Sequence, residues 1–132
     1  MSPWQKFIVI NVHTGLEVYS GSKEDAGDGE WVPVDPVSGA LTINAGDMLQ
    51  VWSNGRVKAA EHRVRASSTG SERHSIAFFL NPSYDADIVP QTSGPDTPAK
   101  YRPINWGAFR ALRFKGDYSD AGEEVQIENY NT

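Results

Sequence analysis

The sequence predicts a fold dominated by β-strands, arranged as a sandwich or barrel. Its 132 residues suffice for one domain, and 39% of them are hydrophobic and 22% charged. Apolar residues alternate with polar ones, or form short β-rich runs, at intervals of roughly ten residues. Twelve glycines and eight prolines supply turns between these runs. Such spacing favours a sandwich or barrel over a βαβ fold.

Seven segments carry the strand pattern. In order along the chain they are 7–12, 16–19, 31–34, 40–44, 48–53, 61–66 and 73–80. The dipeptide Asn54-Gly55 is suited to the positive φ angles of a type I′ turn, so we expect a hairpin tip there. Four aromatic residues within the strand segments are expected in or near the core: Trp31, Trp52, Phe78 and Phe79.

One helix is expected near the C-terminus, after a Pro-rich polar loop over 81–103. Trp106, Phe109 and Leu112 recur there every three residues, with Asn105 placed to cap the helix and Gly116 placed to end it. No internal repeat or linker interrupts the chain. We therefore predict a single domain over 1–132, in which 104–132 form the C-terminal helix and tail.

Charge and the N-terminal sequence narrow the functional classes. Twelve basic against seventeen acidic residues give a net charge of -5, which disfavours nucleic acid as a partner. Without cysteine, any metal must be held by His, Asp and Glu. The apolar run at 7–10 is too short for a signal sequence or a membrane span, so we expect a cytoplasmic protein with no membrane partner. Because the strand pattern begins at once, we also expect the chain to start in mid-domain.

The histidines are candidate functional residues. There are three, His13, His62 and His74, and His13 lies in a loop-like context. Successive side chains of a strand point to opposite faces, so His62 shares a face with Val64 and Ala66. The other face of that strand carries charged residues: Glu61, Arg63 and Arg65. We expect the imidazole of His62 to point inward. The acidic loop over 24–30 lacks the ligand spacing of a calcium loop and is interpreted as solvated.

Arg73 and Ser75 form a second candidate site. They begin a strand, 73–80, whose two faces are both largely apolar, so we expect it to be covered on both sides. An arginine in such a place needs an anionic partner. A bound carboxylate would suit its planar guanidinium and accept a hydrogen bond from the Ser75 hydroxyl. An internal ion pair with Glu72 or Asp47 explains the arginine equally well.

Several blocks in one order resemble the C-terminal half of an iron(II)/2-oxoglutarate oxygenase, of the isopenicillin N synthase-like branch. They are GLEV (15–18), WVPV (31–34), GALTINAGDMLQ (39–50), SNGR (53–56), HRV (62–64) and RHSIAFFLNP (73–82). The resemblance implies a partial double-stranded β-helix, or jelly roll, with a short C-terminal helix. It also implies an oxidoreductase that uses Fe(II), 2-oxoglutarate and dioxygen to oxidise a small organic substrate.

The resemblance assigns His62 as an iron ligand, and Arg73 and Ser75 as binders of the far carboxylate of 2-oxoglutarate. It assigns no catalytic residue beyond the metal site. The family's other two iron ligands form a His-x-Asp or His-x-Glu motif, and no histidine here is followed two positions later by Asp or Glu. We therefore expect a truncated chain that is inactive alone and self-associates through exposed strand edges, such as that of 48–53. The alternative is a noncatalytic β-barrel module that binds a small carboxylate or a protein partner.

Overall fold

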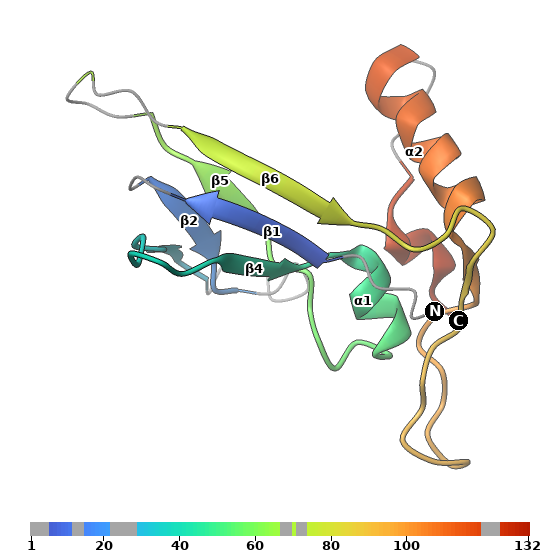
Figure 1. Cartoon of the computed structure of the whole chain (residues 1–132). Helices are drawn as coiled ribbons and strands as arrows, with labels where there is room; N and C mark the ends of the chain where they lie inside the picture. Colours follow the sequence, from blue (N-terminus) through green and yellow to red (C-terminus); the bar gives the residue numbers. More distant parts are fainter. Residues whose placement is uncertain (1–5, 12–14, 22–28, 67–69, 71–73, 120–124) are drawn as a thin grey trace. The chain divides into compact units, whose positions relative to one another are not determined.

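The computed structural model describes residues 6–11, 15–21, 29–66, 70, 74–119 and 125–132 of the chain (Figure 1). They belong to two compact units. The strand unit comprises 7–44 and 59–79, and the helical unit comprises 1–6, 45–58 and 80–132. No helix in the described ranges is long and apolar enough to cross a membrane. The single domain over 1–132, with its helix and tail at 104–132, stays a prediction.

The strand unit contains two sheets of three strands each. Their strands are β1 (Lys6–Asn11), β2 (Leu16–Tyr19), β3 (Trp31–Pro33), β4 (Thr42–Ala45), β5 (His62–Val64) and β6 (Ser75–Leu80). One sheet has the order β4-β1-β6 and the other the order β3-β2-β5 (Figure 1). Asn44 of β4 lies within hydrogen-bond distance of His62 of β5, so the two sheets face each other at that point. Six of the seven predicted strands are therefore confirmed.

The register of β2 against β5 decides which face each side chain takes. The strands are antiparallel, with Leu16 opposite Val64, Glu17 opposite Arg63 and Val18 opposite His62. The backbone N–H of residue 65 donates to the carbonyl of residue 15 at 2.8 Å, and that of residue 19 donates to the carbonyl of residue 61 at 2.9 Å. In an antiparallel ladder hydrogen-bonded and non-hydrogen-bonded pairs alternate. The 16/64 and 18/62 pairs are therefore the non-hydrogen-bonded ones, whose side chains lie closest.

The seventh predicted strand, 48–53, is wrong, because this segment forms helix α1 (Asp47–Trp52). Met48 and Val51 are fully buried, and Trp52 packs against the same core. Side chains three and four positions apart share one face of a helix, so a helix places Met48, Val51 and Trp52 together against the core. The apolar run was short enough to fit either period. The exposed edge expected for 48–53 is therefore also wrong.

The positive φ angles predicted at Asn54 and Gly55 are confirmed, at 55° and 78°. They end helix α1, however, and do not form a hairpin tip. The backbone N–H of Gly55 donates to the carbonyl of Gln50, and that of Asn54 donates to the carbonyl of Val51. These two bonds define a Schellman motif, in which the left-handed residue satisfies the last carbonyls of the helix.

The helical unit holds the main hydrophobic core. Besides α1 it contains the antiparallel pair β7 (Asp87–Ile88) and β8 (Ile104–Asn105), helix α2 (Trp106–Ser119) and a 3-10 helix, η1 (Ile127–Tyr130). Its core consists of Met48, Val51, Ile88, Tyr101, Ile104, Trp106, Phe109 and Ile127. Short helices are marginally stable alone, and most of their stability in proteins comes from packing. Helices α1, α2 and η1 each bury residues in this one cluster, which stabilises all three.

Helix α2 confirms the predicted helix and its start. The backbone N–H of Ala108 donates to the Asn105 side-chain oxygen at 3.1 Å, so Asn105 is the predicted cap. The predicted end at Gly116 is wrong, because the helix continues to Ser119. In its first turn, a Cβ on Gly107 would lie 2.4 Å from the carbonyl oxygen of Tyr84. A glycine at this position lets the helix approach that backbone closely.

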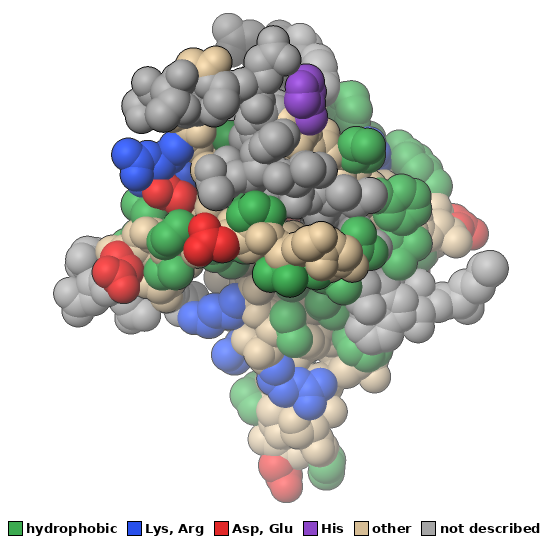
Figure 2. All heavy atoms as spheres, turned by 60° about the vertical axis from the view of Figure 1, so that its left-hand side comes forward, with side chains coloured by type: hydrophobic (Ala, Val, Ile, Leu, Met, Phe, Trp, Pro, Cys, Tyr) green, Lys and Arg blue, Asp and Glu red, His purple; other side chains and the backbone are tan. Residues whose placement is uncertain are grey.

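Strand β6 departs from the expectation of cover on both faces. All six of its residues are exposed, and Ile76 and Phe78 are 68% and 58% exposed. Phe78 and Phe79 therefore do not lie in the core, whereas Trp31 and Trp52 are partly buried as predicted. Apolar side chains are buried only where another element packs against them. In the part of the chain that the structure describes, β6 is an edge strand that pairs with β1 alone. Hydrophobic side chains accordingly reach the molecular surface (Figure 2).

Candidate functional site

His62 opens strand β5 and lies beside Val18 on the face opposite to Arg63. This alternation is the one predicted from the sequence, but the side chain of His62 is exposed, so the prediction that it points inward is wrong. Its imidazole Nδ1 is 3.3 Å from the side-chain nitrogen of Asn44 and 3.3 Å from the carbonyl oxygen of Ala60. Asn44 comes from β4 of the other sheet, so both sheets contribute to the surroundings of this imidazole.

The two contacts of His62 correspond to different tautomers. Nδ1 can carry the proton and donate it to the Ala60 carbonyl, or it can accept a hydrogen bond from the Asn44 amide. In the first form Nε2 carries the lone pair, which is the form of histidine that binds a metal through Nε2. The Ala60 carbonyl suits this tautomer and the Asn44 amide suits the other, at the same distance of 3.3 Å.

The second candidate site is described only in part. Ser75 is the first residue of β6 and is exposed, and His74 precedes it. Arg73 and His13 lie outside the described residues, as does most of the acidic loop at 24–30. The joint binding of a carboxylate by Arg73 and Ser75 therefore stays a prediction. Asp47, considered as an internal partner of Arg73, forms an ion pair with Arg113 in the helical unit.

The donors around His62 do not fit a ferrous iron site by themselves. Among the residues that the structure describes, no group of three or more His, Asp and Glu side chains is placed to hold a metal ion. The described neighbours of the imidazole are an amide and a backbone carbonyl. A ferrous facial triad needs two imidazoles and a carboxylate with open positions between them. Among the described residues, His62 is the candidate for one of these three ligands.

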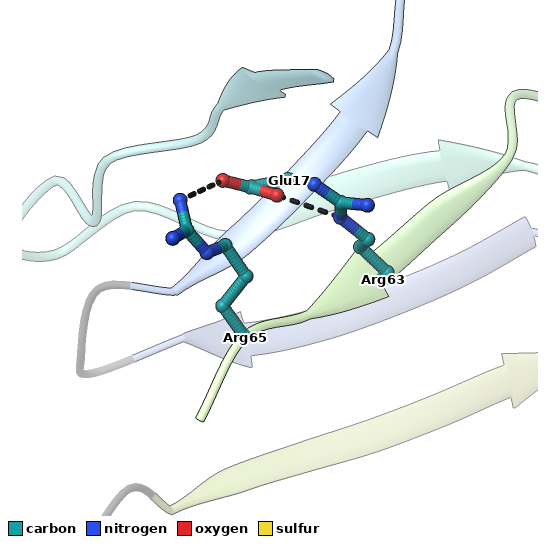
Figure 3. Close-up of polar contacts among 3 residues, drawn as sticks. All are labelled: Glu17, Arg63 and Arg65. Carbon is teal, nitrogen blue, oxygen red and sulfur yellow. Dashed lines mark hydrogen bonds and ion pairs between the residues drawn. The ribbon is translucent and has the colours of Figure 1, made fainter. Parts of the chain in front are cut away.

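The opposite face of the same sheet carries an ion cluster that the sequence did not reveal (Figure 3). The carboxylate of Glu17 accepts a hydrogen bond from Arg63 Nε at 2.7 Å through one oxygen and from Arg65 Nη1 at 3.2 Å through the other. Its side chain is only 9% exposed, against 47% and 68% for the two arginines. The hydrogen bond from Arg63, reinforced by Arg65 and opposed by burial, lowers the pKa of Glu17.

An aromatic ring extends this cluster to the third strand of the sheet. The guanidinium carbon of Arg63 lies 4.0 Å from the ring centre of Trp31, a cation–π distance. Trp31 in turn packs on Tyr19, with the ring centres 5.3 Å apart. The available sequence signal was an acidic residue, Glu17, set between apolar residues of a strand. Its partners could not be chosen without the register of β5.

Comparison with known proteins decides the family. Residues 7–82, more than half of the chain, match the family model of the 2OG-Fe(II) oxygenase superfamily. The chain belongs to this superfamily. The resemblance seen in the sequence is thereby confirmed.

Relatives in this superfamily are much longer than the chain. Gibberellin 2-beta-dioxygenase 5 of Oryza sativa subsp. japonica is 41% identical over 119 residues, which are 89% of this chain and 32% of that protein. A 1-aminocyclopropane-1-carboxylate oxidase of Musa acuminata is 45% identical over 101 residues, 76% of this chain and 31% of that protein. The chain thus spans about a third of the length of these relatives.

Solved structures show the same partial coverage. A dioxygenase for auxin oxidation in rice is 28% identical, with a TM-score of 0.74 over 98% of this chain and 42% of its own. JOX2, solved in complex with 2OG, Fe and JA, is 29% identical, with a TM-score of 0.72 over 99% of this chain and 37% of its own. The predicted jelly roll is therefore confirmed in part: the chain folds as a portion of an oxygenase, mostly strands with two helices.

Proposed function

We propose that this sequence belongs to an iron(II)- and 2-oxoglutarate-dependent dioxygenase that oxidises a small organic substrate with dioxygen in the cytoplasm. The match of residues 7–82 to the superfamily carries the proposal. The similarity to JOX2, whose structure contains 2OG and Fe, supports it. His62 is the iron ligand that this portion contributes, and the remaining ligand pair must come from polypeptide outside these 132 residues. The chain alone is inactive in this proposal.

Arg73 and Ser75 bind the cosubstrate in this proposal. A guanidinium pairs with a carboxylate through two parallel hydrogen bonds, and a serine hydroxyl can donate a third. Ser75 begins β6, and the sequence pattern, in which side chains two positions apart on a strand share a face, is the ground for pairing it with Arg73. The pair therefore suits one carboxylate of a dicarboxylic 2-oxo acid.

The carboxylate site is tested by titrating the chain with 2-oxoglutarate while the NMR signals of the Ser75 amide and the arginine side chains are followed. Arg73→Leu removes a charge-assisted contact to the carboxylate at an exposed strand end, which costs about 1.5–3 kcal/mol, or one to two orders of magnitude in Kd. Ser75→Ala removes a neutral donor and costs about 1 kcal/mol. Ser83→Ala, at an exposed serine outside the strand, is the matched control.

A different outcome would favour the internal ion pair. In that case Arg73→Leu lowers the melting temperature while the Kd of the folded protein for 2-oxoglutarate stays the same. The enzymatic part is tested at the gene: the 5′ sequence of the transcript must encode an in-frame His-x-Asp or His-x-Glu pair. A protein that includes this pair is then assayed for succinate formation that depends on both Fe(II) and 2-oxoglutarate.

The second candidate function is a noncatalytic module that binds a small carboxylate. No histidine of the sequence is followed two positions later by Asp or Glu, and this departure from the family's ligand motif favours it. The two functions differ in their iron dependence. A module binds 2-oxoglutarate equally well with and without Fe(II), whereas in the dioxygenase Fe(II) and 2-oxoglutarate each strengthen the binding of the other once the missing ligands are supplied.

A further inference from the structure

Strand β5 has little of its own to fix its position in the sheet. It is three residues long, and all three are exposed. On the face that carries His62, the neighbouring Val64 is 54% exposed, so apolar burial does not hold the strand in one register. A shift of one residue along β2 would move every side chain of β5 to the other face. His62 would then point away from Asn44.

The opposite face of β5 distinguishes the observed register from a shift of one residue. In the observed register Glu17 lies directly across from Arg63, and Arg65 reaches its second carboxylate oxygen. A shift of one residue in either direction would place Glu17 opposite Val64 or opposite His62 and remove both arginines from its face. A shift of two residues toward the N-terminus of β5 would place it opposite another acidic residue, Glu61, whereas a shift of two residues the other way would place it opposite Arg65 and move His62 along the strand on the same face.

A shift of one residue would separate the poorly hydrated carboxylate of Glu17 from both arginines. The side chain of Glu17 is 9% exposed, and both of its oxygens are engaged by arginines. A buried acceptor that loses its partners is strongly disfavoured. Trp31 on the far side of β2 holds the Arg63 guanidinium over its ring, so β3, β2 and β5 are all linked through this cluster.

We propose that Glu17 is a positioning residue for His62. The outer clamp, which we define as Glu17, Arg63, Arg65 and Trp31, locks β5 in the one register that turns His62 toward Asn44. The importance of that orientation for iron binding rests on the proposed function. The register lock itself requires neither iron nor cosubstrate.

Disulfide trapping tests the clamp directly, because the chain contains no cysteine of its own. The double variant Leu16→Cys/Val64→Cys reports the observed register, since these residues form a non-hydrogen-bonded pair on the His62 face. Val18→Cys/Glu61→Cys reports a shift of one residue. With Glu17 present, the first pair is expected to cross-link under mild oxidation and the second to stay reduced.

In the Glu17→Gln background we expect loss of the first cross-link and appearance of the second. The NMR contact between the His62 ring and the Asn44 amide should disappear with it. Arg65→Gln, which removes the more exposed of the two cations, is expected to give an intermediate result. Glu30→Gln makes the same charge change at an exposed site outside the clamp and should leave both cross-links as they were.

Unchanged cross-linking in both Glu17→Gln and Arg65→Gln would overturn the proposal. If Glu17→Gln does not fold, Arg65→Gln alone decides, because it keeps the carboxylate and one arginine. The test also separates this inference from the proposed function. A chain that fails to bind 2-oxoglutarate but shows the register dependence rejects the proposed function only, and the reverse result rejects only the clamp.

Discussion

Replacement of Phe109 by alanine should be among the most destabilising single changes in the helical unit. Phe109 is 2% exposed, and its ring lies 6.3 Å from that of Trp106 and 6.0 Å from that of Tyr130. Truncation of a buried Phe to Ala typically costs about 3–5 kcal/mol. Because Phe109 links α2 to η1 through aromatic contacts, we expect the upper part of that range. A small domain has a stability of only about 5–15 kcal/mol.

Leu112 supplies the matched control one turn further along α2. It belongs to the same three-residue recurrence in the sequence but is 47% exposed. Leu112→Ala should therefore cost less than about 1 kcal/mol. Urea unfolding by circular dichroism gives the free energy, and amide hydrogen exchange along α2 reports on the helical unit itself. A loss for Leu112→Ala equal to that for Phe109→Ala would refute the burial argument.

Three further predictions concern hydrogen-bonded side chains. In the folded protein the pKa of Glu17 lies below its usual value of 4.5. The ionised carboxylate therefore stabilises the fold above pH 4.5, and this stabilisation is lost as the pH falls through the lower pKa of the folded state. Glu17→Gln should abolish this contribution to the pH dependence of the unfolding free energy in acid. Asn54 accepts from the Lys100 N–H at 2.7 Å and donates to the Pro98 carbonyl at 3.0 Å, so Asn54→Ala should cost about 1–3 kcal/mol in thermal melting. Asn105→Ala removes the cap of α2, should cost about 1 kcal/mol, and should speed hydrogen exchange in its first turn.

The local sequence pattern predicted most of the strands because β-strand alternation survives in short segments. The strand at 16–19 and the start of α2 agree residue by residue with the structure. The pattern failed at α1, where six residues are too few to separate a period of two from one of 3.6. The pattern also predicted burial of both faces of β6, which the structure does not show. Apolar side chains indicate a tendency to be buried, but not whether another element packs against them.

The site shows the same division between local and long-range information. The face of His62 followed from alternation along β5 alone. Its neighbour Asn44 comes from another sheet, 18 residues away in the sequence, and no local pattern pairs two sheets. The partners of Glu17 lie 46 and 48 residues away, so they depend on a register that only the folded sheet defines. Identification of the family added the expected roles of Arg73 and Ser75, which the residues alone left open.

The close approach at Gly107 has a consequence for how this chain can vary. Alanine is the best helix former, and in most exposed helix positions a change from glycine to alanine is beneficial. At position 107 even that single methyl group would collide with the backbone of Tyr84. Among natural alleles or in a saturation library screened for folded protein, we expect this position to tolerate no other residue. An allele that has lost the glycine is expected to encode a protein in which helix α2 or the backbone at Tyr84 has shifted, with a loss of stability.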